Sequence, residues 1–279
     1  MTTATAVAEP GTSAGSATLD HLSWSSISMY RKCPRRFYYH YIEKVPPEFV
    51  AATLALGAGF HAAAESIFQA QLEGEDVPTL EVLLAIFDKH FYEETKKAPE
   101  IRYSKGNDET TIYALAEKML NAYRKYIVAN AEQHSLIIAI EQAYRFELIE
   151  GLPPFEMRLD LLELHRNGEM VITDIKTSKC RYNENDIQEA LPQIVLYAHA
   201  VMPILRELCA EKIVPRLAII TKAKTPVVQI LEPKATQADV EMLKAQVAET
   251  WDAIQAGNFD KHESWQCAHC EYRRHCLGY

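Results

Sequence analysis

The sequence predicts an α/β fold with a helical N-terminal portion. Helical periodicity of apolar residues dominates residues 51–130. Three short segments rich in β-forming residues follow between residues 135 and 176, with turn signals between them. The remaining chain alternates between helical and strand-like patterns, which favours an α/β core over separate α and β domains.

The predicted helical portion consists of four segments. A first helix spans residues 22–42, begins at a capping serine such as Ser23, and is interrupted near Pro34. Amphipathic patterns then predict helices over 51–72, 79–95 and 110–130. In the second of these four helices, Gly57 and Gly59 keep one face slim for close packing.

The predicted core begins with strands over residues 135–149, 155–165 and 169–176. The turn signals between them are Gly151-Leu152-Pro153-Pro154 and Asn167-Gly168, of which the second strongly indicates a hairpin. A helix over 185–209, strands over 213–221 and 227–231, and a helix over 236–256 complete the pattern.

Composition narrows the class of protein. The 279 residues are 48% hydrophobic and 24% charged, which suits one elaborated domain or two small ones. The net charge of -9 argues against a broad basic surface that coats duplex DNA, although a local basic groove remains compatible. Residues 1–20 are rich in Ala, Thr, Ser and Gly without the pattern of a signal peptide, so we expect a disordered tail. No run of about 18 apolar residues occurs, so we expect a cytoplasmic protein without a membrane partner.

Two aspartates and a lysine form the sharpest chemical pattern. Asp174 and Lys176 project to the same face of a predicted strand, and the Asn167-Gly168 hairpin places the strand of Asp160 alongside. Paired carboxylates and a backbone carbonyl suit Mg²⁺ or Mn²⁺, and a nearby ammonium group can orient water or stabilise negative charge. Such a set fits phosphodiester hydrolysis, but a lone Asp-x-Lys is common and also fits an ion pair at a strand end.

Other polar residues lie at helical spacings that bear on this hypothesis. His61 and Glu65 share a helix face, as do Gln193 and Tyr197 on the helix that follows the Asp174 strand. Taken alone, His61 is more simply a packed or solvated residue, and the Gln193–Tyr197 pair is ordinary polar surface.

The cysteines are unevenly distributed. Cys267, Cys270 and Cys276 have the close spacing of metal ligands, and Cys33 is the candidate for a fourth ligand. Spacing alone is equally compatible with iron and with zinc, and His269 or His275 could replace one cysteine around zinc. We expect Cys180 and Cys209 to be ordinary cysteines.

A basic and aromatic segment surrounds Cys33. It interleaves stackable rings with arginines, an arrangement that suits single-stranded nucleic acid; its main candidates for DNA contact are Tyr30, Arg31, Arg35 and Arg36. The alternative is that the rings belong to the core and the basic residues flank the cysteine site.

The ordered series His61, Asp160, Asp174-Ile175-Lys176 and Gln193-Ile194-Val195-Leu196-Tyr197 resembles the motifs of RecB-type PD-(D/E)XK nucleases, including CRISPR-associated RecB-like nucleases. The opening Ser26-Ile27-Ser28-Met29-Tyr30-Arg31-Lys32-Cys33-Pro34-Arg35-Arg36-Phe37 is similar to the start of that domain. The resemblance implies a restriction-endonuclease-like core, a mixed central sheet flanked by helices, with a cysteine-rich C-terminal clip. Residues 21–279 would form the nuclease domain, with a helical insert at 73–134 and the cysteine cluster segment at 264–279.

The resemblance also implies residue roles. His61, Asp160, Asp174 and the Ile175 carbonyl would bind Mg²⁺ or Mn²⁺, and Lys176 would be the catalytic lysine. Gln193 and Tyr197 would position the DNA strand or the lysine. Cys33, Cys267, Cys270 and Cys276 would bind a 4Fe–4S cluster, with zinc as the alternative. Glu141 is either a support for the ligands or a surface residue of its strand. The family often has a glycine a few residues before the first aspartate, which is absent from Phe155-Glu156-Met157-Arg158-Leu159.

The implied activity is a metal-dependent DNA exonuclease on single-stranded ends, in DNA repair or CRISPR biology, with a helicase or CRISPR integrase as a possible partner. Two other hypotheses remain open. The chain could be a catalytically silent module that binds DNA or scaffolds a partner, or a regulatory domain built on zinc or an iron–sulfur cluster.

Overall fold

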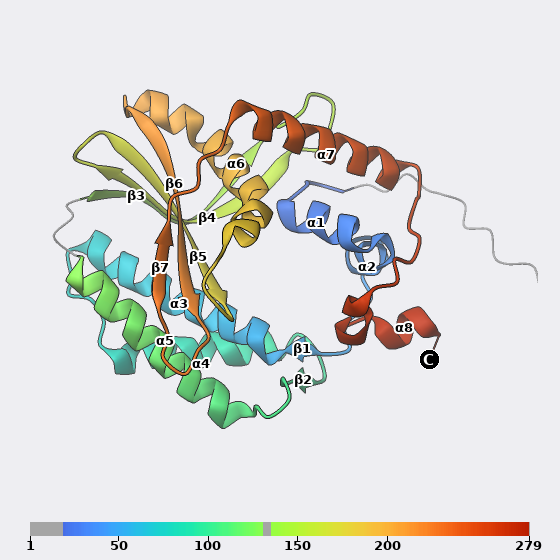
Figure 1. Cartoon of the computed structure of the whole chain (residues 1–279), viewed down its shortest axis with the longest axis horizontal. Helices are drawn as coiled ribbons and strands as arrows, with labels where there is room; N and C mark the ends of the chain where they lie inside the picture. The colour runs from blue at the N-terminus through green and yellow to red at the C-terminus, as the bar shows by residue number, and fades with distance from the viewer. Residues whose placement is uncertain (1–18, 131–134, 279) are drawn as a thin grey trace, which may run out of the picture.

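The computed structural model describes residues 19–130 and 135–278, and within them a mixed five-stranded sheet is flanked by helices (Figure 1). The helical elements are α1 (Trp24–Lys32), α2 (Pro34–Phe37), a π-helical turn η1 (Tyr38–Ile42), α3 (Ala52–Glu73), α4 (Leu80–Thr95), α5 (Glu109–Ala129), α6 (Glu184–Glu207), α7 (Gln237–Gln255), a 3-10 turn η2 (Trp265–His269) and α8 (Arg273–Leu277). The strands are β1 (Val50–Ala51), β2 (Ile101–Arg102), β3 (Ser135–Phe146), β4 (Phe155–His165), β5 (Glu169–Ser178), β6 (Lys212–Thr221) and β7 (Val228–Leu231).

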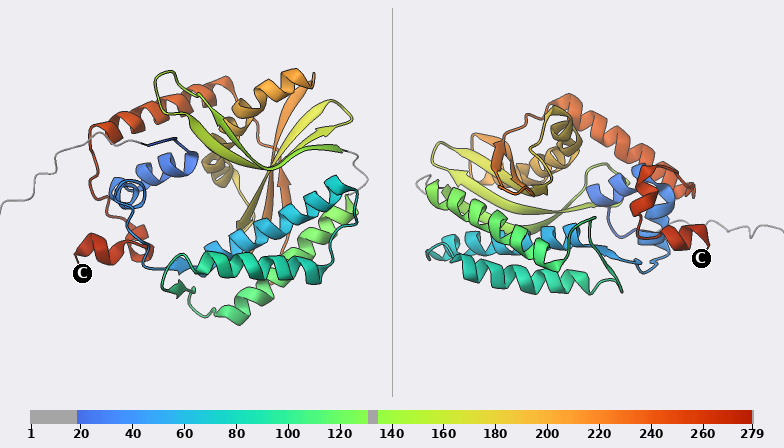
Figure 2. Two further views of the ribbon diagram at one scale, coloured as in Figure 1. Left: turned by 180° about the vertical axis from the view of Figure 1, so that it is seen from behind. Right: turned by 60° about the horizontal axis from the view of Figure 1, so that its bottom comes forward.

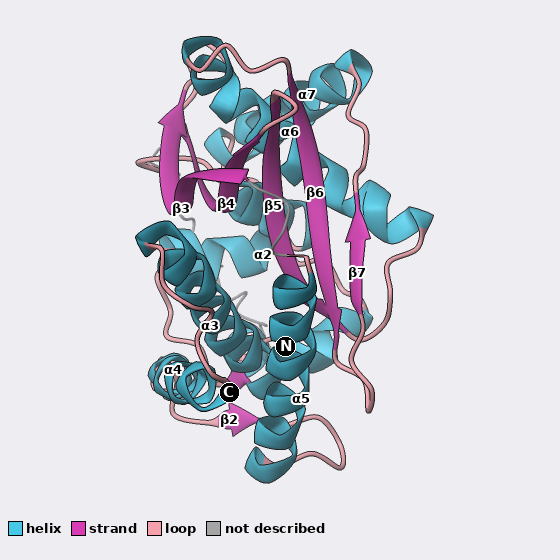
Figure 3. Cartoon of the chain, turned by 90° about the vertical axis from the view of Figure 1, so that its left-hand side faces the viewer, coloured by secondary structure: helices cyan, strands magenta, loops and turns pink. Residues whose placement is uncertain are grey.

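The main sheet has the order β3-β4-β5-β6-β7. All neighbouring strands are antiparallel except β5 and β6, which are parallel and are connected through α6. The hairpin between β4 and β5 turns at Gly168, whose φ of 81° lies in the left-handed region that glycine tolerates. The predicted α/β class and the mixed sheet are therefore confirmed (Figure 3).

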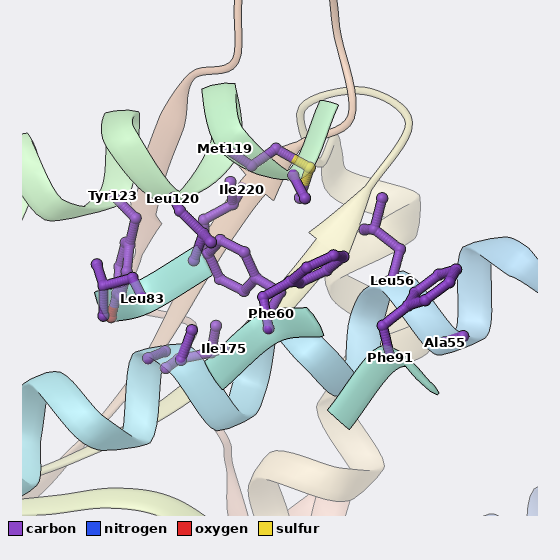
Figure 4. Close-up of a cluster of buried hydrophobic side chains, with 14 of the residues drawn as sticks. Ala55, Leu56, Phe60, Leu83, Phe91, Met119, Leu120, Tyr123, Ile175 and Ile220 are labelled. Atoms are coloured by element: carbon purple, nitrogen blue, oxygen red, sulfur yellow. The ribbon is translucent and has the colours of Figure 1, made fainter. Parts of the chain in front are cut away.

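Helices cover both faces of this sheet (Figure 2). On one face, α3, α4 and α5 pack with Ile175 and Ile220 into the largest apolar cluster, in which Phe60 and Tyr123 are fully buried (Figure 4). On the other face, α6 packs its Tyr197 and Val201 against strand residues of β4 and β5. Within the described residues, no helix is long and apolar enough to cross a membrane.

The boundaries of the longer elements follow local sequence signals. Asp108, Asn183 and Thr236 cap α5, α6 and α7, and each side chain accepts a hydrogen bond from a backbone N–H in the first turn of its helix. The predicted strands over 155–165 and 213–221 match β4 and β6 to within one residue.

Two local expectations need correction. The expected single helix over 22–42 is α1, α2 and η1, because Cys33 adopts an extended backbone before Pro34 and Pro34 then starts a new helix. The two-residue strands β1 and β2 were not predicted, since a pair this short has no detectable periodicity. Of the expected tail at 1–20, residues 1–18 lie outside the described residues.

The N-terminal helices meet the C-terminal segment (Figures 1 and 2). The Glu48 N–H donates to the Glu271 carbonyl at 2.9 Å, and the Glu48 carboxylate accepts from the backbone N–H of Arg274 at 2.7 Å. Segments more than two hundred residues apart in the sequence are thereby joined at the end of the molecule where the cysteines lie.

Candidate functional site

Strands β4 and β5 separate at the position of the two aspartates. Their pairing runs only over Leu161–Leu164 against Met170–Thr173, and the same register would set Asp160 opposite Asp174. The Asp160 carboxylate accepts a hydrogen bond from the Ile175 N–H at 2.6 Å. A side chain thus satisfies a backbone group that the sheet leaves unpaired, and this fixes Asp160 beside the Asp174–Lys176 segment.

Asp174, Lys176, Gln193 and Tyr197 form a closed hydrogen-bonded ring between β5 and α6. Lys176 Nζ lies 3.1 Å from Asp174 Oδ1 and donates to Gln193 Oε1 at 3.0 Å. Gln193 Nε2 donates to the Tyr197 hydroxyl, which donates to Asp174 Oδ1 at 2.9 Å. The ring fixes both the ammonium group and the carboxylate, because each member is held by two others.

His61 and Glu141 approach Asp160 from different elements. His61 on α3 places Nδ1 at 3.7 Å from Asp160 Oδ2. Glu141 on β3 has a carboxylate oxygen within 4.8 Å of ligand atoms of both His61 and Asp160. The sequence does not assign Glu141 a role, because the irregular backbone at this residue is not visible in a hydrophobic pattern.

The electrostatic environment favours a neutral histidine and a charged lysine. Burial lowers the pKa of His61, which keeps its imidazole unprotonated near neutral pH. Burial also disfavours the charged form of Lys176, but the Asp174 and Asp160 carboxylates outweigh it and raise the pKa of the lysine.

The carboxylates, in contrast, are crowded. Burial and then the Asp174 carboxylate raise the pKa of Asp160 well above its usual range. Burial and then the Glu65 carboxylate raise the pKa of Glu141 to about 7. Carboxylates held this close repel one another, and a bound cation would offset that repulsion.

The polar ring and Asp160 border a cavity of about 310 Å³, whose lining does not include His61 or Glu141. Its lining includes Asp160, Asp174 and Lys176 from the sheet, Gln193 and Tyr197 from α6, and Ser23, Trp24 and Ser25 from the start of α1. The start of α1 is held there because the Leu22 N–H donates to the Pro154 carbonyl and the Glu156 N–H donates to the Leu22 carbonyl. The cavity therefore combines the polar ring with the N-terminal segment.

The donor set fits a divalent cation. Asp174 is 3% exposed, and its Oδ2 is buried without a hydrogen-bond partner among the described residues. A buried carboxylate oxygen without a donor is costly, and a cation in the space beside it would offset that cost. With Asp160 and the neutral His61 nearby, the oxygen and nitrogen ligands suit Mg²⁺ or Mn²⁺.

The four cysteines of the proposed cluster border a second cavity of about 230 Å³; they are Cys33, Cys267, Cys270 and Cys276. Within the described part of the chain, no three of these sulfur atoms lie within 4.8 Å of one another. Zn–S bonds of about 2.3 Å would hold tetrahedral ligands about 3.8 Å apart. Cys180 and Cys209 are exposed and do not border this cavity.

The segment around Cys33 is attached to the C-terminal part of the chain by polar and aromatic contacts. Arg36 donates to Glu271 at 2.8 and 3.1 Å, and His40 Nδ1 lies 2.8 Å from the Tyr272 hydroxyl. Tyr30 is 7% exposed, packs against Phe37 and donates its hydroxyl to the Asn258 carbonyl at 2.6 Å. These contacts favour the core alternative for Tyr30 and a structural role for Arg36.

The two other arginines of this group remain accessible to different degrees. Arg31 pairs with Glu249 at 3.6 Å and is 40% exposed, and Arg35 lies 5.9 Å from the Tyr38 ring centroid on the wall of the cysteine cavity. The structure thus brings together the predicted residues of the polar ring, with His61 and Asp160 beside it. The four cysteines are grouped apart from the polar ring, and Arg35 and Arg36 line the same cavity as the cysteines.

Comparison with known proteins identifies a family. The family model of the PD-(D/E)XK nuclease superfamily matches residues 21–277. No curated protein matches the sequence. Among solved structures, the chain is similar to a protein from Eubacterium rectale described as a candidate exonuclease, with 15% identity and a TM-score of 0.43, over 85% of this chain and 91% of that one. It is also similar to SSO0001, with 14% identity and a TM-score of 0.35, over 81% of this chain and 84% of that one.

Proposed function

The chain belongs to the PD-(D/E)XK nuclease superfamily, and from that premise we propose that it is a metal-dependent deoxyribonuclease that removes nucleotides from single-stranded ends. The single observation that carries the proposal is the ring of Asp174, Lys176, Gln193 and Tyr197, which leaves one buried oxygen of Asp174 free for a cation. A site that served only to fold the sheet would have no need for a buried, unpartnered carboxylate oxygen.

The residues divide into ligands and a catalytic lysine. His61, Asp160, Asp174 and the Ile175 carbonyl would hold Mg²⁺ or Mn²⁺, which when bound polarises the phosphate and lowers the pKa of a water molecule. Lys176 orients the attacking water or stabilises the negative charge that develops on the phosphate. Gln193 and Tyr197 hold Lys176 and Asp174 in position through the hydrogen bonds of the ring.

The preference for a single strand is supported by the shape of the cavity. Helix α1, strand β4 and helix α6 each contribute to its lining, so the reactive groups lie in a recess rather than on an open face. A flexible single strand can enter such a recess more readily than a duplex. Arg31 and Arg35 are the candidates for contact with the phosphates beyond it.

We also propose a 4Fe–4S cluster at the cysteine site. Cys33 and the three C-terminal cysteines share one cavity, and four thiolates that line one cavity are a suitable ligand set for such a cluster. The cluster would clip residues 264–279 to the N-terminal segment of the domain at 21–279. Closing a loop of this length restricts the unfolded chain and so stabilises the fold.

The biological setting remains at the level of classes. We propose DNA repair or CRISPR adaptation as the process, a helicase or integrase as the partner that supplies ends, and the cytoplasm as the location. The helical insert at 73–134 contains α4 and α5, which contribute to the largest apolar cluster. It would therefore be an integral part of the fold rather than an appended module.

The test is digestion of end-labelled single- and double-stranded DNA by anaerobically purified protein. We expect cleavage with Mn²⁺, none with EDTA, and none by Asp174→Asn, with faster digestion of the single strand. Cleavage that persists in EDTA or in the variant would overturn the proposal. No cleavage by folded, Mn²⁺-loaded wild-type protein would instead favour a silent DNA-binding module.

A further inference from the structure

The start of helix α1 places an aromatic side chain in the wall of the cavity beside the polar ring. Trp24 is the first residue of α1 and borders this cavity together with Asp160 and Lys176. It is half-buried, because it also packs against the apolar cluster that contains Val195 and Leu196. Within the part of the chain that the structure describes, Trp24 stacks on no other aromatic ring and its indole N–H has no hydrogen-bond partner. Part of the ring and its N–H are therefore available to a ligand in the cavity.

The chain on both sides of Trp24 is fixed before any ligand binds. The Ser23 hydroxyl accepts from the Ser26 N–H at 3.1 Å, and the Ser26 hydroxyl accepts from the Ser23 N–H at 3.0 Å. On the other side, Leu22 forms two backbone hydrogen bonds with the start of β4, at 2.8 and 2.7 Å. An aromatic side chain on a backbone held in this way loses little conformational freedom when a ligand packs against it.

Arg158 adds a cation to the wall of the same cavity. It lies on β4 two residues before Asp160, borders the cavity and is exposed. Among the described residues it forms no ion pair, although the chain as a whole carries a net charge of -9. A guanidinium group without a carboxylate partner is a suitable contact for a phosphate group, which it can bind through two parallel N–H donors.

A flat aromatic ring and a free guanidinium group match the two parts of a nucleotide. Bases stack on aromatic side chains whatever their sequence, and the backbone phosphate is anionic. The cavity of about 310 Å³ is at the small end of ligand sites, so it suits one such unit. We infer that the cavity holds one unpaired nucleotide of a single strand, with its base stacked on Trp24 and a neighbouring phosphate bound by Arg158.

This inference rests on the proposed function and deepens it, because it gives the preference for a single strand a physical basis. A base within a duplex is already stacked on its neighbours and paired with its complement. It can reach Trp24 only after it has lost both interactions, whereas a base in a single strand is free to stack. Trp24 would therefore be a residue that determines specificity, while the polar ring carries the chemistry.

The first test is a scan of short single strands in which one base at a time, counted from either end, is replaced by an abasic residue. Affinity is measured by fluorescence anisotropy in EDTA, where the proposed cleavage does not occur. We expect one position at which loss of the base weakens binding to the wild-type protein about 5–150-fold, the range measured for a base stacked on an aromatic side chain. Equal effects at all positions, or none, would overturn the inference.

Variants of Trp24 assign that position to its ring. Trp24→Ala should bind the intact strand about 5–150-fold more weakly, and the abasic residue at the sensitive position should then cost nothing further. Trp24→Phe retains a flat ring and should keep most of the affinity. The matched control is Trp265→Ala, because Trp265 is 79% exposed and does not border the cavity, so this variant should bind as the wild type does. An abasic penalty that persists in Trp24→Ala, as a purely structural role predicts, or an equal loss in Trp265→Ala, would contradict stacking on Trp24.

The phosphate contact is tested through the salt dependence of binding. Arg158→Gln removes one cation, so the slope of log affinity against log salt concentration should become less steep by about 0.7. Arg166→Gln is the control, because Arg166 is an exposed residue in the turn between β4 and β5 and lies outside the lining of this cavity. An unchanged slope in Arg158→Gln, or an equal change in both variants, would remove Arg158 from the site.

Cleavage of the same strands with Mn²⁺ separates this inference from the proposed function. Wild-type protein that cleaves DNA but has no sensitive abasic position would keep the nuclease proposal and remove the nucleotide site. Wild-type protein with one sensitive position that disappears in Trp24→Ala, but without cleavage, would keep the nucleotide site and remove the nuclease proposal.

Discussion

At the scale of single residues, Tyr197 belongs both to the polar ring, through its hydroxyl, and to an apolar cluster, through its aromatic ring. It donates to Asp174 and accepts from Gln193, while its ring packs in the apolar cluster below α6. The hydroxyl is therefore held in place by packing, and it in turn fixes the carboxylate. Replacing a group that orients a metal ligand in this way typically lowers metal affinity or activity about 10–100-fold.

Replacement of Tyr197 by phenylalanine tests this role. Because the ring packing is retained and only the hydroxyl is lost, we expect Mn²⁺ affinity or cleavage to fall about 10–100-fold with little change in stability. The measurements are calorimetric titration, cleavage rate and melting temperature. Tyr126→Phe on α5 is the control, and equal effects of the two variants would contradict the assignment.

The raised pKa of Glu141 should make the stability of the metal-free protein depend on pH. This pKa is about 7 in the fold and near 4.5 when unperturbed, so the folded chain binds this proton more tightly than the unfolded chain. The stabilising contribution is therefore fully present below about pH 4.5 and is lost as the pH rises through about 7. Glu141→Gln lacks this group, so its melting temperature in EDTA should rise relative to wild type between these values. A constant difference would contradict the account.

At the scale of elements, helix α3 is positioned by one close contact. A Cβ on Gly59 would lie 2.7 Å from the Phe87 ring and 2.8 Å from the Phe87 carbonyl, so α3 and α4 pack closely there. A Cβ on Gly57 would meet the Thr177 hydroxyl at 3.6 Å, which is ordinary contact. His61 is two residues after Gly59, so this packing also sets the approach of the imidazole to Asp160.

Alanine at each glycine gives a matched pair of predictions. Gly59→Ala should lower the free energy of unfolding by about 1–3 kcal/mol, because the packed Phe87 has to move. Gly57→Ala should raise it by about 0.5–1 kcal/mol, because alanine favours the helix. Urea denaturation of the full chain measures both, and the account fails if the two variants shift stability in the same direction.

At the scale of the whole molecule, the two faces of the sheet pack against different groups. One face carries the main apolar cluster with α3, α4 and α5, while the opposite side holds the polar ring between β5 and α6. The N-terminal segment is bound to two other parts of the chain. Leu22 joins it to β4, and Arg36 joins it to the C-terminal segment. Helices α1 and α2 thereby connect the cavity beside the polar ring to the cavity lined by the cysteines.

Much of this arrangement follows from sequence, but the exceptions have physical causes. Alternation and the Asn167-Gly168 turn placed β4 and β5 correctly and so brought Asp160 near Asp174. Helical spacing placed Gln193 and Tyr197 on one face of α6. The burial of Tyr30 and the approach of Glu141 depend on long-range packing and on an irregular backbone, for which a local pattern has no signal.

The most direct test of the central claim is cleavage of end-labelled single-stranded DNA by Lys176→Ala beside Lys224→Ala, both loaded with Mn²⁺. Lys176 is held by Asp174 and Gln193 at the cavity, whereas Lys224 lies in the exposed turn between β6 and β7. We predict that Lys176→Ala still folds and binds Mn²⁺ but cleaves at least about 100-fold more slowly, and that Lys224→Ala cleaves at the wild-type rate. Wild-type cleavage by Lys176→Ala would contradict the assignment of this ring as the active site.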